Sequence, residues 1–493
     1  MLVTVNAGVR YELATPQYEA NNKLANFDPA SKTLIQAKDG SIYNRALVNM
    51  PLTNVGPRFG FAYSATPSLV VRGGYGITYT QFNRAGGENN LTYNGPNVVN
   101  ATINNVVPTA ASLCVTDTQD QTKCFRQTQQ GYAVGLTAAA NFNPALVTSR
   151  YIPSNMPTGY VQSYHLSVQR QLPGQIVADL AYVRNKGTHL QILADYNQAA
   201  ICTAALATGC PSSTLAARRP VPTFGDIEIA YGGGTSNYNS LQFKLEKRYR
   251  NGLYLLNSFT WGRTFDLSGG HLETSNGDNS RIDFANPGGD YGRSNYDQPL
   301  NNTTSIIYDL TYGKGRRFGA SAPYVADMVL GGWQMTIINT MNSGLPTNLN
   351  YSNSTSNGTN VTDLYTYRPN VVGNPIAPAA NRVKTNTALT GYLLKAVGSG
   401  LPGVSLPTSG SPFGNAQRNM VVGPSFYQTD FGIHKDFGLW SEASKLEFRA
   451  EAFNVLNKVN YQAPDGNVSN GSFGSITGAY PARQLQLAAK LIF

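Results

Sequence analysis

Four cysteines carry the most reactive side chains of this sequence, and they form two local pairs. Cys114 lies close to Cys124 and Cys202 close to Cys210, in polar segments rich in small residues. A zinc site is weakly supported, because no Cys-x-x-Cys spacing exists and the four histidines lie far from these cysteines in sequence. Two short loop disulfides fit better and indicate an oxidising compartment, with four free thiols as the alternative.

Charged residues at every second position form the other group that could do chemistry. Glu447, Arg449 and Glu451 alternate with Phe448 and Ala450. In a strand this spacing puts all three charges on one face. They could pair with charges on neighbouring strands, or neutralise one another without a further role.

Motifs of catalytic sites are missing. The sequence has no Gly-x-Ser-x-Gly elbow, no His-Glu-x-x-His and no phosphate-binding loop. Two clusters rich in Asp, Asn and Gly, Asn276–Asn279 and Asp465–Asn470, could bind calcium but lack the EF-hand spacing and its closing glutamate. We therefore expect no enzyme activity, no metal and no cofactor.

The composition narrows the class of protein. The 493 residues carry 37 Lys and Arg against 27 Asp and Glu, a net charge of +10, and only 13% are charged, about half the share of about 25% in soluble domains. High aromatic content argues against disorder. The basic residues are scattered, so nucleic acid is not an expected partner. No apolar run reaches the length of about 18 residues that a membrane helix needs.

Alternating apolar and polar residues predict many long strands. Between residues 3 and 11, Val, Ala and Tyr alternate with polar residues and glycine. Most such segments exceed the usual length of about 5–6 residues and reach the length of about 9–11 that crosses a bilayer. We count about twelve, at residues 2–13, 54–66, 68–82, 158–172, 175–190, 237–250, 252–266, 301–314, 330–346, 424–438, 443–456 and 482–493.

Short and long connections alternate along the chain. Tight turns such as Asn251-Gly252 join five pairs of segments, and each of the six other connections is long. Outer-membrane barrels have short periplasmic turns and long external loops. We therefore predict an all-β, antiparallel transmembrane β-barrel, with both cysteine pairs on external loops.

One strand fixes the expected orientation of the two faces. Leu241, Phe243 and Leu245 should point outward to lipid, and the intervening Gln242, Lys244 and Glu246 inward to a watered lumen. The three tryptophans suit interfacial girdles: Trp261, Trp333 and Trp440.

The C-terminal segment carries a pattern used in membrane insertion. Apolar residues stand at every second position and end in a terminal phenylalanine: Leu485, Leu487, Ala489, Leu491 and Phe493. This ending resembles the signal by which the barrel-assembly machinery recognises outer-membrane proteins.

Several stretches resemble the barrel region of Oar-like TonB-dependent receptors, from the first strand to the last residue. They are NVGPRFGFAYSAT with LVVRGGYGITY, GYVQSYHLSVQRQLPG, NYNSLQFKLEKRYRNGLYLLNSFTWGRTFD, LGGWQMT, GNAQRNMVVGPSFYQTDFGIHKDF, LEFRAEAFNVLNKVNY and FGSITGAYPARQLQLAAKLIF. The resemblance is specific in the strands and poor in the loops. FRAEAFNVLNKVNY is its most specific element.

The resemblance implies a larger protein than these residues. Such receptors have about 22 strands around a plug, so the chain is expected to be the C-terminal part of the barrel. Signal peptide, TonB box, plug and regulatory-like domain have no counterpart here. In the intact receptor, the Glu447, Arg449 and Glu451 charges could meet the plug.

The implied function is uptake of an unidentified nutrient, such as a carbohydrate, peptide or siderophore, across the outer membrane of a Gram-negative bacterium. The expected partners are outer-membrane lipid, the barrel-assembly machinery and, through the missing plug region, TonB. Two alternatives stay open. One is a plug-less outer-membrane adhesin or surface-assembly barrel, and the other is a secreted soluble β-protein.

Overall fold

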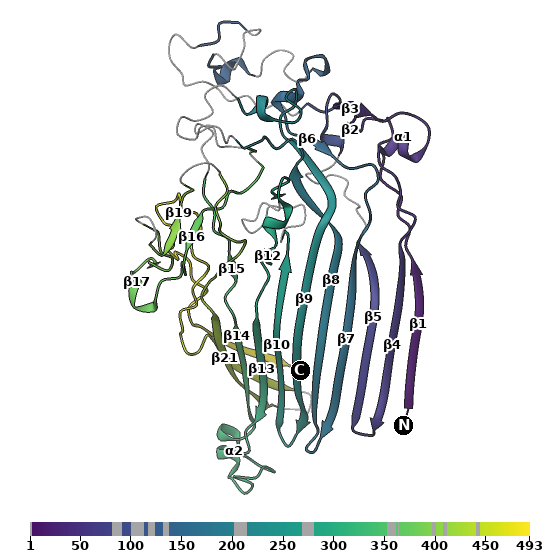
Figure 1. The fold of residues 1–493 in the computed structure, drawn as a ribbon. Helices are drawn as coiled ribbons and strands as arrows, with labels where there is room; N and C mark the ends of the chain where they lie inside the picture. Colours follow the sequence, from purple (N-terminus) through teal and green to yellow (C-terminus); the bar gives the residue numbers. More distant parts are fainter. Residues whose placement is uncertain are drawn as a thin grey trace.

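One long antiparallel sheet dominates the computed structural model, which describes residues 2–80, 91–99, 113–116, 124–131, 138–201, 214–268, 281–352, 361–362, 364–396, 401–407, 412–439 and 444–493 (Figure 1). Twelve strands follow one another in chain order along it, and we call this path the wall. They are β1 (Leu2–Tyr11), β4 (Val55–Thr66), β5 (Leu69–Thr80), β7 (Gly159–Leu172), β8 (Ile176–Asp195), β9 (Ile227–Arg250), β10 (Leu253–Asp266), β13 (Leu300–Asp309), β14 (Trp333–Asn342), β21 (Phe426–Gly438), β22 (Lys445–Phe453) and β23 (Gln484–Ile492). All twelve predicted segments are confirmed as strands.

The turn chemistry explains why neighbours in sequence are neighbours in space. Asn251 and Gly252 both have positive φ, at 55° and 77°. A two-residue turn with positive φ at both positions matches the twist of the flanking strands. Short connections of this kind lie together at one end of the wall and the long connections at the other, as Figure 1 shows.

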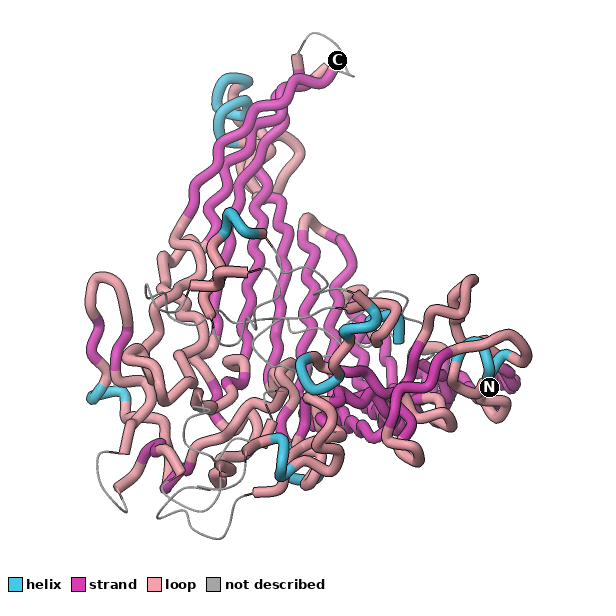
Figure 2. The backbone as a smooth tube through the Cα atoms, turned by 90° about the horizontal axis from the view of Figure 1, so that it is seen from above, coloured by secondary structure: helices cyan, strands magenta, loops and turns pink. Residues whose placement is uncertain are grey.

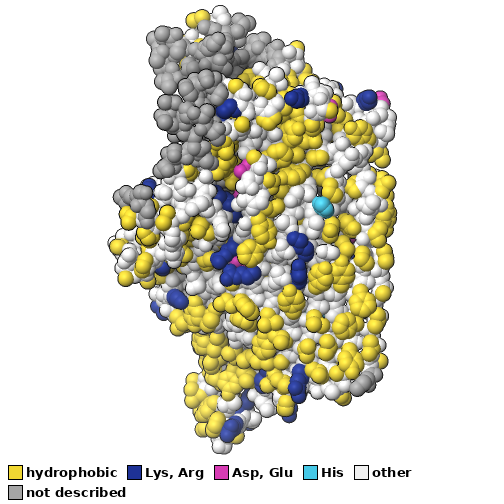
Figure 3. Space-filling model, viewed as in Figure 1, with side chains coloured by type: hydrophobic (Ala, Val, Ile, Leu, Met, Phe, Trp, Pro, Cys, Tyr) yellow, Lys and Arg dark blue, Asp and Glu magenta, His cyan; other side chains and the backbone are white. Residues whose placement is uncertain are grey.

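The two faces of the wall differ in chemistry. Phe243 pairs with Leu180 of β8 and Phe259 of β10, so these side chains share a face, and Phe243 and Leu180 are exposed. Hydrophobic side chains gather over the strands on the side that Figure 3 shows, and the C-terminal strands curve away behind it (Figures 1 and 2). The apolar face is thus the outer face of a curved wall, and Lys244 lies on the inner face.

The wall is an open sheet. Among the described residues, β1 pairs only with β4, and β23 only with β22. The described strands do not close into a ring, and the total of about 22 strands that the resemblance implies stays a prediction. The edge strands β1 and β23 each leave a row of backbone N–H and C=O groups that need hydrogen-bond partners inside a membrane.

The long connections contain more structure than predicted. Residues 191–195 and 227–236, expected in a loop, extend β8 and β9 beyond the other strands. β6 (Ser149–Tyr151), β11 (Arg281–Ile282) and β12 (Gly292–Arg293) join the large sheet. Separate two-stranded sheets pair β2 (Ala25–Asp28) with β3 (Thr33–Gln36), β15 (Pro346–Thr347) with β20 (Val421–Val422), β16 (Asn370–Val372) with β19 (Gly403–Ser405), and β17 (Val383–Lys384) with β18 (Leu389–Thr390).

Helices are few and short. α1 (Ile42–Ala46) follows β3, and α2 (Tyr324–Leu330) lies in the connection between β13 and β14 at the turn end, where no helix was predicted. Within the described ranges, no helix is long and apolar enough to span a membrane. Short 3-10 helices occur at Leu91–Tyr93, Thr128–Gln130, Ala139–Asn141, Pro144–Leu146, Ala216–Arg218, Pro287–Asp290 and Ala379–Asn381.

Candidate functional site: the loop layer

The long connections, together with the outer ends of β8 and β9, fold into a layer at one end of the wall, which we call the loop layer. Its described residues form five clusters of buried apolar side chains, which include Leu349, Leu193, Ile229, Phe27 and Val361 in turn. These clusters bury apolar surface away from water, as a soluble domain does. The loop layer is therefore a folded body that can hold side chains in place.

A fully buried glutamate ties three strands of the layer together. Glu228 of β9 is 0% exposed and forms ion pairs with Arg150 of β6 and Arg281 of β11. The Arg281 Nε donates to Glu228 Oε2 at 2.6 Å. A buried carboxylate is stable only with such partners, because removing a charge from water is costly.

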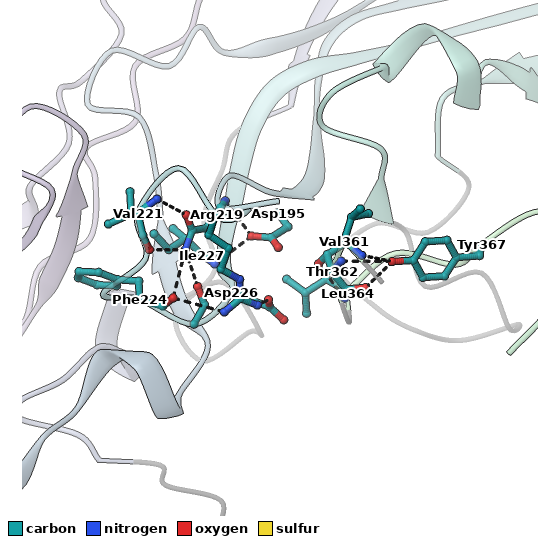
Figure 4. Close-up of polar contacts among 12 residues, drawn as sticks. Asp195, Arg219, Val221, Phe224, Asp226, Ile227, Val361, Thr362, Leu364 and Tyr367 are labelled. Carbon is teal, nitrogen blue, oxygen red and sulfur yellow. Dashed lines mark hydrogen bonds and ion pairs between the residues drawn. The ribbon is translucent and has the colours of Figure 1, made fainter. Parts of the chain in front are cut away.

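A second buried group joins the end of β8 to the start of β9 (Figure 4). Asp195 Oδ1 accepts hydrogen bonds from the backbone N–H of Asn197 at 2.9 Å and of Ile227 at 3.0 Å. Arg219 forms an ion pair with Asp226 nearby. Burial raises the pKa of the Asp195 carboxyl, although hydrogen bonds from Thr362 and these backbone groups oppose the shift.

Two more acidic residues join distant connections. Asp290 pairs with Arg368 and accepts a hydrogen bond from the Tyr365 hydroxyl at 3.1 Å. Burial raises the pKa of Asp290, while the Arg368 charge opposes the shift. Asp266, at the end of β10, pairs with Arg418. The connections around residues 290, 368 and 418 are thus held in one arrangement.

A hollow of about 790 Å³ opens in the loop layer, beside Arg219. Its walls include the polar side chains of Gln198, Arg218 and Asp283 and the apolar side chains of Ile201 and Phe413. Gln198 Nε2 donates to Asp283 Oδ1 at 2.8 Å, which fixes two of these polar groups. A volume of this size, with a few placed polar groups and an aromatic ring, suits a small ligand.

One of the two predicted cysteine pairs lies in the described part of this layer. Cys114 and Cys124 form a disulfide with a Cα–Cα distance of 5.1 Å. Cys202 and Cys210 lie outside the described residues. Of the two calcium candidates, Asn276–Asn279 also lies outside them, and Asp465 Oδ2 accepts hydrogen bonds from Asn470 and Ser472. In the part of the chain that the structure describes, no three His, Cys, Asp or Glu side chains gather as metal ligands would.

The charge cluster on β22 lies on the inner face of the wall. Arg449 forms an ion pair with Glu447, which is 8% exposed. In register, Glu447 lies between Asp436 of β21 and Lys490 of β23. Glu451 lies on the same face, opposite Gly432 and Gln486. The cluster is part of the polar inner face of the wall, and its three residues do not line the loop-layer hollow.

The C-terminal apolar residues lie on the outer face of the edge strand β23. Ala489 pairs in register with Phe448 of β22. All five are exposed: Leu485, Leu487, Ala489, Leu491 and Phe493. Trp440 lies outside the described residues, whereas Trp261 lies on the outer face of β10, opposite Leu241. An exposed apolar face of this kind is available to lipid, and its role as an assembly signal stays a prediction.

Sequence reasoning missed the buried acids of the loop layer. Asp195, Glu228 and Asp290 come from segments expected to be irregular. One signal was present: Glu228 stands between Ile227 and Ile229, as an acid inside an apolar strand does. Its partners, however, come from segments far away in the chain.

Comparisons with known proteins agree with this architecture. The family model for an outer membrane beta barrel domain matches residues 2–486. No curated protein matches the chain.

Solved structures that the chain matches over most of its length include three outer-membrane proteins. They are the outer membrane transporter YddB from Escherichia coli (10% identity, TM-score 0.43, 90% of this chain and 41% of that chain), the FrpB iron transporter from Neisseria meningitidis (8%, 0.41, 100% and 43%), and BauA, the ferric preacinetobactin receptor from Acinetobacter baumannii (9%, 0.37, 90% and 37%). The chain spans less than half the length of each. By its family match over nearly all of its residues, it belongs to the outer membrane beta-barrel domain family and is a protein of the Gram-negative outer membrane.

Proposed function

We propose that this chain forms the C-terminal barrel portion of a TonB-dependent, Oar-like receptor that takes up a nutrient across the outer membrane. The observation that carries the proposal is a wall that is polar inside and open at both edges. An inner face with Lys244, Arg449 and Glu447 suits a watered or plugged lumen. The free edges of β1 and β23 suit a wall that further strands complete.

The loop layer supplies the proposed site of ligand capture. Its buried ion pairs hold the hollow beside Arg218 and Phe413 at the end of the wall where long connections gather. Guanidinium, amide and carboxylate groups beside an aromatic ring can hydrogen-bond to and stack on a carbohydrate, a peptide or a siderophore. In this proposal the loop layer captures the ligand on the outside, and a plug in the intact receptor carries the energy-coupled step.

Binding to TonB is the direct test. The intact gene product, purified from native outer membranes, is mixed with the periplasmic domain of TonB, and binding is measured by calorimetry. We expect binding that disappears when the segment preceding the first wall strand is deleted. An intact product that does not bind TonB, or whose gene encodes no plug, would overturn the proposal and favour the adhesin or surface-assembly barrel.

The capture site has its own test. Cells lacking the gene are complemented with the parent gene or with Arg218→Gln, and accumulation of labelled oligosaccharides, peptides and ferric siderophores is compared with and without a protonophore. We expect one class to accumulate only in energised cells, and less with Arg218→Gln. A matched change at an exposed loop-layer lysine, Lys384→Gln, should leave accumulation at the parent level.

A further inference from the structure

The helix α2, at the turn end of the wall, has an unusual surface. Tyr324, Val325, Met328 and Val329 share one face at helical spacing, and their exposed fractions run from 44% to 79%. The helix carries one charged residue, Asp327, whose Oδ1 accepts the backbone N–H of Lys314 at 2.6 Å. The charged side is thus turned to the protein, and the apolar side is turned away from it.

The connection that carries α2 is tightly folded. Gly313, with φ of 125°, lies against Gly331, where an added Cβ would come within 3.1 Å of the Gly313 Cα and 2.4 Å of Asp327. The side chain of Trp333 also holds the end of α2 against β14, because its Nε1 donates a hydrogen bond to the carbonyl of Val329 at 2.9 Å. The apolar face is therefore presented by an ordered unit.

A buried lysine fixes α2 to the outer face of the wall. Lys435 of β21 pairs in register with Trp333 and Phe448, on the apolar outer face, yet it is only 3% exposed. Its Nζ donates to the carbonyls of Met328 and Gly331 at the end of α2. The lysine satisfies carbonyls that a helix end leaves open, and the helix covers a charge that would otherwise face lipid.

Basic residues flank the helix on its N-terminal side. Lys314, Arg316 and Arg317 are exposed, and Arg316 also lies 3.4 Å from Asp309. With Asp327 as the single acid of residues 313–331, the segment has a net charge of 3 − 1 = +2. Figure 3 shows Lys and Arg side chains beside hydrophobic side chains at the tip of the molecule that carries α2.

We propose that residues 313–331 form an interfacial anchor, with α2 lying in the membrane leaflet at the turn end and its basic residues binding phospholipid phosphates. Two observations and one general property of amphipathic helices identify lipid as the partner of the apolar face of α2. The apolar face continues the outer face of the wall through Lys435, Trp333 and Phe448. The adjacent charge is positive, complementary to a phosphate surface. A short helix with an apolar face and basic flanks lies in the interface plane, with its apolar face about 5–10 Å below the headgroup boundary.

Fluorescence quenching by brominated lipid tests the position of α2. Val325→Trp on α2 and Val383→Trp in the loop layer are the same substitution at side chains exposed by 65% and 59%. Each variant is reconstituted into bilayers whose acyl chains carry bromine at shallow or deep positions, and the signal of the three native tryptophans is subtracted.

We expect Val325→Trp to be quenched, and most strongly by shallow bromines, because an interfacial helix lies about 5–10 Å deep. Val383→Trp should stay unquenched. If Val325→Trp is quenched no more than Val383→Trp, the anchor is disproved. Quenching that falls as the protein-to-lipid ratio rises would also overturn the proposal, since it would show a second copy covering the helix.

Lipid preference tests the phosphate contacts. In the Val325→Trp background, quenching by brominated phosphatidylglycerol is compared with brominated phosphatidylcholine at equal mole fraction. Replacing Lys314, Arg316 and Arg317 with glutamine should lower the preference for the anionic lipid by up to about fivefold for each residue, or about 1 kcal/mol each. The same triple change at the loop-layer lysines Lys32, Lys38 and Lys384 alters net charge equally. Equal losses in both triple variants would overturn the phosphate contacts.

Discussion

The wall and the loop layer are built from one chain but bury their apolar side chains in opposite ways. On the wall, Leu180 and Phe243 are exposed by 47% and 36% and point outward. In the loop layer, Leu349 and Ile227 are fully buried, and buried charges form ion pairs such as Glu228 with Arg150. The difference indicates two solvents. The apolar side chains of the wall contact lipid, whereas the loop layer buries its apolar side chains away from water.

Removing one buried charge should destabilise the loop layer most, while leaving the wall strands unchanged. Glu228→Gln leaves Arg150 and Arg281 with no carboxylate in a buried site, which should destabilise the loop layer by about 3–5 kcal/mol. Hydrogen exchange measured by mass spectrometry over residues 149–151 and 281–282 should accelerate, while the wall strands keep their protection.

The matched control lies on the wall. Glu246 pairs with Lys244 at 3.0 Å, where the side chains are 28% and 52% exposed. Glu246→Gln should cost less than about 1 kcal/mol, as for other exposed pairs. Equal acceleration in the two variants would show that Glu228 has no special role in holding β6, β9 and β11.

Truncating a leucine should have a large effect in the loop layer and a small one on the wall. Leu349→Ala removes a side chain with 0% exposure from the core around Val404 and Val421 and should cost about 2–5 kcal/mol. Leu485→Ala acts at a side chain that is 75% exposed on β23. Thermal unfolding in lipid vesicles should separate the two, and equal losses would mean that β23 is buried against a further strand or partner.

Adding a charge should destabilise the wall more than the loop layer, the reverse of what truncating a leucine does. Leu180→Arg puts a guanidinium on the lipid-facing side of β8 and should cost about 2–4 kcal/mol near the bilayer midplane. Leu401→Arg, at a loop-layer side chain that is 53% exposed, should change stability by no more than about 0.5 kcal/mol. The yield of folded protein in vesicles measures both, and a tolerated Leu180→Arg would contradict the lipid-facing assignment.

The wall could be predicted from sequence because its information is local. Alternation and a turn such as Asn251-Gly252 are readable within a few residues, and they predicted all twelve strands. The loop layer depends on contacts such as Asp266 with Arg418, which lie 152 residues apart. Charged pairs at that separation leave no local pattern. The helix α2 was missed for another reason, since seven residues are too few for helical periodicity to stand out.

Titration of two loop-layer acids, Asp195 and Asp465, should change the free energy of unfolding least. The pKa of Asp195 is raised by burial, so its carboxyl binds protons more readily in the folded state. Its contribution to stability is therefore present below the ordinary value of 3.8 and is lost as pH rises through the folded pKa. Asp195→Asn keeps an Oδ1 acceptor for Ile227 and should stabilise the loop layer at neutral pH.

Asp465 should show the opposite sign. Burial would raise its pKa, but hydrogen bonds from Ser472, the Asn467 N–H and Asn470 outweigh burial and lower it. Its contribution is present above the ordinary value of 3.8 and is lost as pH falls through the lower folded pKa. Asp465→Asn should thus destabilise the loop layer at neutral pH, where Asp195→Asn stabilises it. Thermal unfolding of each variant relative to the parent, from pH 3 to 7, should give slopes of opposite sign. Slopes of the same sign would mean that hydrogen bonding, and not burial, controls Asp195.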